Sequence, residues 1–75
     1  MNAGIAVANR IIELYRERGL SINKLATLSG VSQSTINNVT SGRNNSTTVA
    51  TVKKLCDGLG ITLGEFFSTP EFDGL

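Results

Sequence analysis

The sequence contains no histidine and a single cysteine, Cys56, so the commonest bases and nucleophiles of enzymes are nearly absent. Cys56 has no histidine to act as its base. The acidic residues near the C-terminus do not have the spacing of metal ligands, and Gly58-Leu59-Gly60 does not follow a strand as a nucleotide-binding loop would. These absences predict that the protein is not an enzyme and has no catalytic residues, no metal and no cofactor.

Long apolar runs are absent as well, and no stretch reaches the length that crosses a bilayer. The N-terminus, MNAGIAVANR, has no basic residue ahead of its weak apolar stretch, so it is a poor signal peptide. One cysteine cannot form an intramolecular disulfide, which fits a reducing compartment. We therefore expect a cytoplasmic protein with no membrane partner. The 75 residues, without an internal repeat or a linker, predict one domain over residues 1–75.

The net charge of +1 is low for a nucleic-acid-binding protein, but the charges are unevenly distributed. Residues 18–54 contain five basic side chains and no acid, whereas residues 55–75 contain four acids and no base. The middle of the chain is therefore suited to phosphates, and the acidic end would be repelled by them. Chance clustering is the alternative explanation. Lys53 and Lys54 fit solvated charges better than DNA contacts.

Apolar residues recur at helical spacing in several short segments. The expected helices are Ile5 to Arg18, Ile22 to Leu28, Gln33 to Thr40, a fourth helix capped by Thr47 or Thr48, and Leu63 to Phe67. Val49, Val52, Leu55, Cys56 and Leu59 would form the inner side of the fourth helix. Ser21, Ser32 and Thr62 are candidate N-caps, and Gly19, Gly30, Gly42 and Gly60 are candidate helix ends. Residues 71–75 would add a helical turn or trail loosely. The pattern predicts an all-α fold, a compact bundle of about five short helices.

Residues 21–41 are the most informative part of the chain, because two short helical patterns meet at the tight turn Ser29-Gly30-Val31. The residues expected to face inward are Leu25, Ala26, Val31, Ile36 and Val39. The outward face of the second helix would show Gln33, Ser34, Asn37 and Asn38. These uncharged donors and acceptors are suited to base edges in a major groove, although a solvated helix face would look similar. The pattern predicts a helix-turn-helix.

The segment from Arg10 to Phe67 resembles the Cro/cI repressor-type, or XRE, family of helix-turn-helix transcriptional regulators. The resemblance lies in the order and spacing of Ile11, Leu14, Leu25-Ala26, Ser29-Gly30-Val31-Ser32, Ser34-Thr35-Ile36, Ser41-Gly42-Arg43, Thr48-Val49, Leu55, Leu59-Gly60-Ile61 and Glu65-Phe66-Phe67. It implies a lambda-repressor-like DNA-binding domain that binds double-stranded operator DNA, usually as a symmetric homodimer on a palindromic site. It also implies a bacterial, phage or mobile-element origin.

The resemblance implies a role for each matching position. The base-reading positions are Gln33, Ser34, Asn37 and Asn38. The positions next to phosphates are Ser21, Ile22, Ser32, Arg43, Asn44, Asn45 and Ser46, and Thr35 is intermediate between a base methyl and a phosphate. The C-terminal region of the family often contributes to dimerisation, which makes Phe67 and Phe72 candidate dimer contacts. Phe66 is expected in the core.

The chain departs from the family in two ways. Many members pair an arginine late in the first helix with a glutamate near the end of the third, and here those positions are Tyr15 and Thr40. Both charges are lost together, and Tyr15 would fill the space by packing. The reading helix also has no Lys or Arg, so it lacks the commonest contact to guanine. We therefore expect a bias towards A·T pairs in the half-site.

The leading interpretation is a sequence-specific DNA-binding transcriptional regulator, a repressor as in most of this family, that reads the major groove with the helix Gln33 to Thr40. The alternative is an antitoxin-like interaction module whose acidic, phenylalanine-rich tail, about residues 68–75, binds a partner protein. A third interpretation, the reading head of a longer regulator with a ligand-sensing domain, ranks lower.

Overall fold

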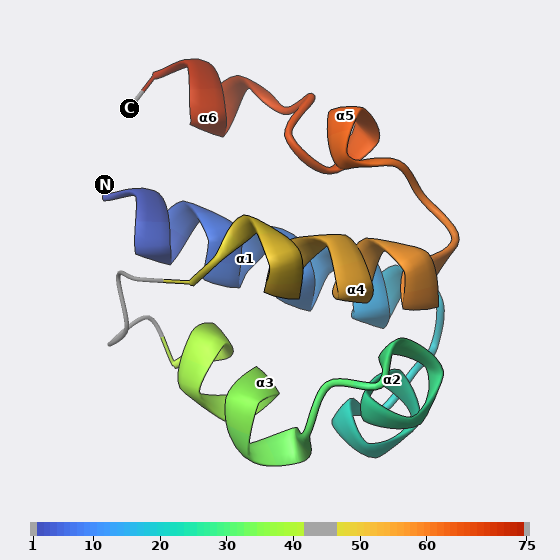
Figure 1. Cartoon of the computed structure of the whole chain (residues 1–75). Helices are drawn as coiled ribbons and strands as arrows, with labels where there is room; N and C mark the ends of the chain where they lie inside the picture. The colour runs from blue at the N-terminus through green and yellow to red at the C-terminus, as the bar shows by residue number, and fades with distance from the viewer. Residues whose placement is uncertain (1, 42–46, 75) are drawn as a thin grey trace.

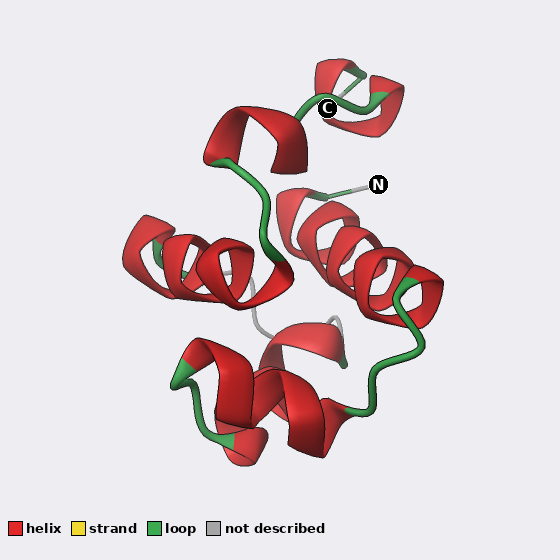
Figure 2. Cartoon of the chain, turned by 90° about the vertical axis from the view of Figure 1, so that its right-hand side faces the viewer, coloured by secondary structure: helices red, strands yellow, loops and turns green. Residues whose placement is uncertain are grey.

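The computed structural model describes residues 2–41 and 47–74, and the regular elements in these two segments are all helices. They are α1 (Ala3–Glu17), α2 (Ile22–Ser29), α3 (Gln33–Thr40), α4 (Val49–Leu59), α5 (Leu63–Phe66) and α6 (Pro70–Asp73). In Figure 1, α2 and α3 lie at one end of the molecule and α5 and α6 at the other. Figure 2 shows α1 and α4 on opposite sides of the middle level.

Short-range hydrogen bonds begin the helices where the sequence predicts them. The side chains of Ser21, Ser32, Thr48 and Thr62 each accept a hydrogen bond from the amide three residues later. These oxygens satisfy amide groups that have no partner inside the helix. Thr48, not Thr47, is the cap of α4. Gly30 and Gly60 end α2 and α4 in the left-handed region, with φ of 73° and 75°, where a side chain would be strained.

The core is formed by the apolar faces of α1 to α5. Its buried members are Ile11, Leu14, Leu25, Val31, Ile36, Val39, Val52, Leu55, Cys56, Leu59 and Phe66. The predicted inward face of the helix-turn-helix is therefore confirmed, with Ala26 half-buried at its edge. Cys56 and Phe66 are fully buried, as expected of core residues.

Some details of the predicted helices differ from the structure. Val49 is 67% exposed and does not belong to the inner side of α4, because this first residue lies one turn before the buried stripe that starts at Val52. The first helix starts at Ala3 because the side chain of Asn2 accepts a hydrogen bond from Ile5 and caps it. α2 ends one residue later than predicted, at Ser29, and α5 one residue earlier, at Phe66. Of the two alternatives for residues 71–75, the structure has the added helical turn, α6, with Pro70 at its first position, where the missing N–H costs nothing.

Two arginine side chains donate hydrogen bonds to backbone carbonyls near the ends of helices. Arg10 of α1 donates from Nε to the carbonyl of Phe66 and from Nη2 to that of Glu65, at 2.8 Å each. Arg18 donates to the carbonyls of Leu59 and Leu14, at 3.1 and 3.2 Å. The accepting carbonyls lie at or near helix C-termini, where intrahelical donors run out.

Candidate nucleic-acid interface

The turn between α2 and α3 is held by a compact set of hydrogen bonds. Gly30 N donates to the carbonyl of Ala26 at 2.9 Å, and the Ser29 hydroxyl donates to that of Leu25 at 2.7 Å. The amide of Val31 then donates to Ser29 Oγ at 3.3 Å. With Leu25 and Val31 buried beneath it, this turn orients α3 relative to α2.

The outer face of α3 carries the four predicted base-reading residues. Gln33, Ser34, Asn37 and Asn38 are all exposed, while Ile36 and Val39 on the other side of the helix are buried. In the part of the chain that the structure describes, these four side chains form no hydrogen bond. Their amide and hydroxyl groups are therefore free to bond an external ligand.

At the start of α3, the N-cap residue Ser32 forms one hydrogen bond more than the capping pattern in the sequence predicts. Ser32 Oγ accepts from the amide of Thr35 at 3.2 Å and donates to Thr35 Oγ1 at 2.9 Å. The single hydroxyl hydrogen of Ser32 is thus engaged, while that of Thr35 is not. An anion at this helix end would meet the backbone amides of Gln33 and Ser34 and the Thr35 hydroxyl before the hydroxyl of Ser32.

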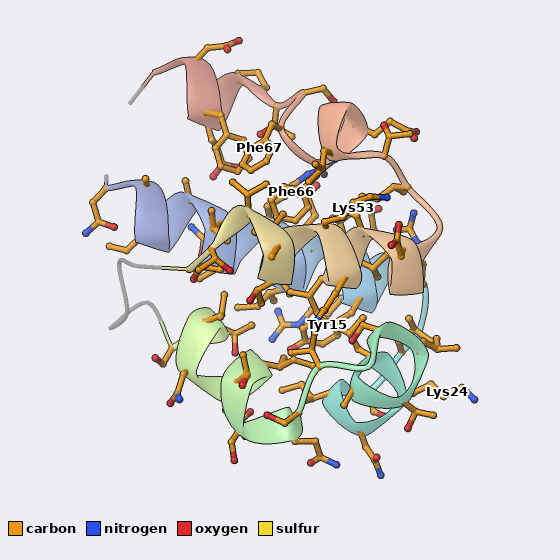
Figure 3. All side chains as sticks on the ribbon, in the orientation of Figure 1. Tyr15, Lys24, Lys53, Phe66 and Phe67 are labelled. Carbon is orange, nitrogen blue, oxygen red and sulfur yellow. The ribbon has the colours of Figure 1, made fainter. Side chains whose placement is uncertain are left out.

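The start of α2 lies at the same end of the molecule as α3 (Figure 1). Ser21 Oγ accepts from the amide of Lys24 at 3.0 Å, which leaves its own hydrogen available. The amide of Ile22, at the first position of α2, has no acceptor among the described residues. Lys24 is exposed on the first turn and points outward from α2 (Figure 3).

Part of the predicted phosphate-binding set is not described. Arg43, Asn44, Asn45 and Ser46 lie outside the described residues, as does the predicted helix end Gly42. Their roles remain predictions from the resemblance.

Fewer basic side chains of residues 18–54 are available to contact DNA than their number in the sequence indicates. Arg18 is held by carbonyl groups, and Lys53 forms an ion pair with Asp57 on the next turn of α4. The hydrogen bond to Asp57, and the attraction of its charge, raise the pKa of Lys53. Figure 3 shows Lys53 on the side of α4 that faces α5, away from α3. Lys54 is exposed, in agreement with a solvated charge.

Tyr15 and Thr40 are the two residues at which the sequence departs from the pattern implied by the resemblance. The ring of Tyr15 is half-buried and packs against the core, as predicted. The hydroxyl of Thr40 donates to the carbonyl of Ile36 at 2.8 Å. The side chains of Tyr15 and Thr40 form no hydrogen bond with each other.

The three phenylalanines form one cluster at the end opposite α3. The ring centroids of Phe67 and Phe72 are 4.9 Å apart with an interplanar angle of 73°, a T-shaped contact. Phe67 remains 38% exposed and Phe72 is half-buried. The acids Glu71 and Asp73 are exposed on the same short helix, α6. This end therefore combines aromatic surface with negative charge.

Over residues 2–41 and 47–74, no group of three or more histidine, cysteine, aspartate or glutamate side chains could hold a metal ion. Within the same segments, no helix is long and apolar enough to cross a membrane. Burial raises the pKa of the Cys56 thiol, which keeps it protonated and unreactive.

A family model described as helix-turn-helix matches residues 11–66, most of the chain. The chain belongs to this helix-turn-helix family. Its members are DNA-binding transcriptional regulators, not enzymes, and the resemblance to the Cro/cI, or XRE, type is confirmed.

Curated relatives carry the same designation. The chain is 37% identical over 68 residues to the HTH-type transcriptional regulator PuuR of Escherichia coli, covering 91% of this chain and 36% of PuuR. It is 44% identical over 59 residues to the HTH-type transcriptional regulator SlrR of Bacillus subtilis, covering 77% of this chain and 39% of SlrR. The chain thus spans less than two fifths of the length of these relatives.

Two solved structures have the same fold. The crystal structure of prophage Lp1 protein 11 superposes with a TM-score of 0.86 at 37% identity, covering 100% of both chains. An HTH_3 family transcriptional regulator from Vibrio cholerae gives a TM-score of 0.80 at 34% identity, covering 87% of this chain and 36% of that one.

Sequence reasoning missed the contacts of Arg10 and Arg18, which hold the scaffold behind the reading surface. Arg18 was counted with the basic, DNA-facing residues, and only its partner carbonyls show its structural role. No sequence pattern indicates a bond between Arg10 and a carbonyl 56 residues away.

Proposed function

We propose that this chain is a sequence-specific transcriptional repressor that inserts α3 into the major groove of operator DNA. The observation that carries the proposal is the outer face of α3, where four exposed side chains have free hydrogen-bonding groups and no charge. Gln33, Asn37 and Asn38 suit adenine, which offers a donor and an acceptor side by side. Repression would follow from occupancy of a promoter.

The free groups at the starts of α2 and α3 support the same placement. Ser21, the amide of Ile22 and the cap of α3 would lie against phosphates, with Arg43 and residues 44–46 as further contacts. Thr35 keeps a free hydroxyl hydrogen between these groups and the base-reading face. Residues 1–75 would act as one DNA-binding domain, with residues 21–41 as its helix-turn-helix.

The bound form would be a homodimer, because one domain of this size makes few contacts. Its two α3 helices would enter successive major grooves about 34 Å apart on a palindromic site. Phe67 and Phe72 remain candidate dimer contacts. These two residues lie at the end of the molecule opposite α3. If the dimer were formed only through that end, the two α3 helices would lie at the two far ends of the dimer. A surface nearer α3 would therefore have to contribute to the operator-bound dimer.

Selection from a randomised duplex pool, followed by sequencing of the bound fraction, tests the proposal. The expected result is a palindromic consensus rich in A·T pairs within each half-site. Asn37→Ala should relax one position in each half-site of that consensus and weaken operator binding roughly five- to 150-fold per half-site, as expected for a lost bidentate contact.

Asn9→Ala is the matched control, because Asn9 is also an exposed helical asparagine without a hydrogen bond among the described residues. It should leave the consensus and the affinity unchanged. No enrichment by the folded wild-type chain at low salt would contradict the proposal, and a consensus dominated by G·C contacts would contradict the A·T bias.

The second candidate function is an antitoxin-like module that binds a partner protein through the C-terminal tail. It is favoured by the exposed ring of Phe67 beside Glu71 and Asp73, at the end of the molecule away from α3. Co-purification from the native host with wild-type protein, but not with a Phe67→Ser variant that still binds operator, would support this function. Equal recovery with both would contradict it.

A further inference from the structure

The chain leaves α1, α2 and α4 through a glycine in the left-handed region, and the end of α2 differs from the other two. The glycines have φ of 65°, 73° and 75° and are Gly19, Gly30 and Gly60. After α1, the amide of Leu20 donates to the carbonyl of Tyr15 at 2.9 Å. After α4, the amide of Ile61 donates to the carbonyl of Cys56 at 3.0 Å. At both of these ends, a backbone hydrogen bond to the fifth residue back fixes the direction in which the chain continues.

At the end of α2, a side chain takes the place of that backbone bond. The carbonyl of Ala26, five residues before Val31, accepts from the amide of Gly30 at 2.9 Å. The amide of Val31 donates to Ser29 Oγ at 3.3 Å and has no other acceptor among the described residues. The Ser29 hydroxyl is itself held in place, because it donates to the carbonyl of Leu25 at 2.7 Å.

Ser29 is also the residue of α2 against which the backbone of α4 packs. A Cβ at Gly58 would lie 2.9 Å from the Cα, the Cβ and the amide nitrogen of Ser29. Because the two backbones approach this closely, Ser29 cannot shift towards α4. On its other side, Val31 is 6% exposed in the core and directly precedes Ser32, the N-cap of α3. The hydroxyl of Ser29 therefore links a residue fixed by α4 to the residue from which the chain enters α3.

We propose that Ser29 is a positioning residue for DNA recognition, whose hydroxyl sets the direction in which α3 leaves the turn. This inference rests on the proposed function, since it assigns the accuracy of the base contacts of α3 to the last residue of α2. Without the hydroxyl, the amide of the buried Val31 loses its only acceptor among the described residues. The turn must then shift until this amide finds another acceptor.

A small change of direction at the turn becomes a large displacement along α3. The eight residues of α3 span about 12 Å, so a rotation of about 10° at Ser32 moves the far end of the helix by about 2 Å. Asn37 and Asn38 lie in that far half. Contacts to bases need side chains placed within about 0.5 Å, whereas the attraction of basic groups to phosphates depends little on such a shift. Loss of the hydroxyl should therefore lower sequence specificity more than general affinity for DNA.

The variant Ser29→Ala tests the proposal, because it removes only the oxygen. Binding is compared with that of the wild type at a temperature at which circular dichroism shows both proteins fully folded. The affinity for the selected operator should fall at least about fivefold relative to the affinity for an unrelated duplex, as for one mismatched base pair. A role limited to stability would leave this ratio of affinities unchanged, and an unchanged ratio would overturn the proposal.

Thr27→Val is the matched control in the same helix. The hydroxyl of Thr27 donates to the carbonyl of Asn23 at 3.1 Å, four residues back, as the hydroxyl of Ser29 does to Leu25. No described amide donates to the Thr27 hydroxyl, so its removal leaves the turn as it is. The ratio of the two affinities should equal that of the wild type. An equal fall in both variants would assign the effect to α2 in general and would overturn the assignment to Ser29.

A second measurement needs no DNA. Residual dipolar couplings of the backbone amides in α2 and α3 give the angle between these helices in solution. The angle should change by at least about 10° in Ser29→Ala and stay constant in Thr27→Val, and an unchanged angle in Ser29→Ala would overturn the proposal.

The wild type alone provides a further check that depends on no substitution. The amide hydrogen of Val31 should exchange slowly with solvent, and exchange at the rate of a free amide would overturn the proposal. If the wild type binds no duplex at all, the proposed function fails, and the angle between α2 and α3 still decides whether Ser29 directs α3.

Discussion

Arg10 joins two parts of the chain that are 56 residues apart in sequence. Its side chain is 14% exposed and binds the carbonyls of Phe66 and Glu65 as well as the carboxylate of Glu13. Arg10→Ala would leave these carbonyls without their donor, so we expect the free energy of unfolding to fall by about 1.5–3 kcal/mol. Urea unfolding followed by circular dichroism measures the change.

Arg16→Ala is the control for this prediction, because Arg16 is an exposed arginine of the same helix whose side chain forms no hydrogen bond or ion pair with a described residue. It should cost about 0.5 kcal/mol or less, mainly through its favourable position near the C-terminus of α1. Equal losses in the two variants would show that Arg10 acts through its charge alone and not through the α5 carbonyls.

Cys56 should make the free energy of unfolding depend on pH in the alkaline range. Burial raises the pKa of its thiol, so the folded protein keeps this proton more tightly than the unfolded chain does. The free energy of unfolding should therefore be unaffected below the unfolded pKa of about 8.5 and should decrease as the pH rises above it. Urea unfolding between pH 7 and 10 measures the decrease.

The variant Cys56→Ala isolates the contribution of the thiol from that of Lys53, whose raised pKa acts in the same direction. It should be less stable at pH 7 because of the lost packing, but its stability should fall less steeply above pH 8.5. Parallel pH profiles for the two proteins would contradict the assignment to Cys56.

Residue-scale features were predictable from the sequence when they depend on near neighbours. The caps at Ser21, Ser32 and Thr62 were found because each bonds an amide three residues away. The exposure of Val49 was not, because helical spacing says which face a residue lies on, not where along the helix the core begins.

At the scale of helices, the closest approach of α2 and α4 depends on Gly58. A Cβ at this position would lie 2.9 Å from the Cα, the Cβ and the amide nitrogen of Ser29, all at the end of α2. These atoms belong to the backbone or its first side-chain carbon, so they cannot rotate away. Gly58→Ala should therefore push the two helices apart and cost about 1–3 kcal/mol, despite the better helix propensity of alanine.

Gly64 of α5 provides the opposite case for the same substitution. The nearest atom to its added Cβ would be Thr62 Oγ1 at 3.7 Å, an ordinary contact. Gly64→Ala should therefore raise the free energy of unfolding by about 0.4–1 kcal/mol, since alanine restricts the unfolded chain. Thermal unfolding of both variants measures the difference, and destabilisation by both would mean that α5 is more tightly constrained than this contact indicates.

The helices themselves were predictable, but their packing was not. Gln33 to Thr40 was predicted to its exact ends, because Ser32 caps it and its apolar positions repeat at helical spacing. From the sequence, in contrast, Gly58-Leu59-Gly60 was considered only as a nucleotide-binding loop, and that role was excluded. Its first glycine has a structural role that appears only once α2 lies across it.

At the scale of the whole molecule, the charge segregation along the sequence becomes a separation in space. The molecule measures 31 × 23 × 21 Å along its principal axes, and α3 and α6 lie at opposite ends (Figure 1). The Debye length at 0.15 M salt is about 8 Å, so charges at the α6 end are largely screened from DNA bound at α3. The acids of the tail are therefore free to act on a different partner.

Deletion of residues 68–75 would be a poor test of a role for the acidic tail. The ring centroid of Phe72 lies 4.9 Å from that of Phe67 and 6.0 Å from that of the buried Phe66. The deletion would therefore expose part of the core. Reversing the charges in the double variant Glu71→Lys and Asp73→Lys keeps these rings in place. Both acids are exposed, so the fold should tolerate the change.

We expect this charge reversal to change operator affinity by less than about threefold at 0.15 M salt. At 0.01 M salt the Debye length of about 30 Å spans the molecule, so the increase in operator affinity should be larger. A partner protein held by the acidic end should bind the double variant far more weakly at either salt concentration. Fluorescence anisotropy with a labelled operator measures the first effect, and the neutral variant Glu71→Gln with Asp73→Asn should lie between the two. A large gain in operator affinity at 0.15 M salt would mean that α6 approaches the DNA in the complex, contrary to its position opposite α3.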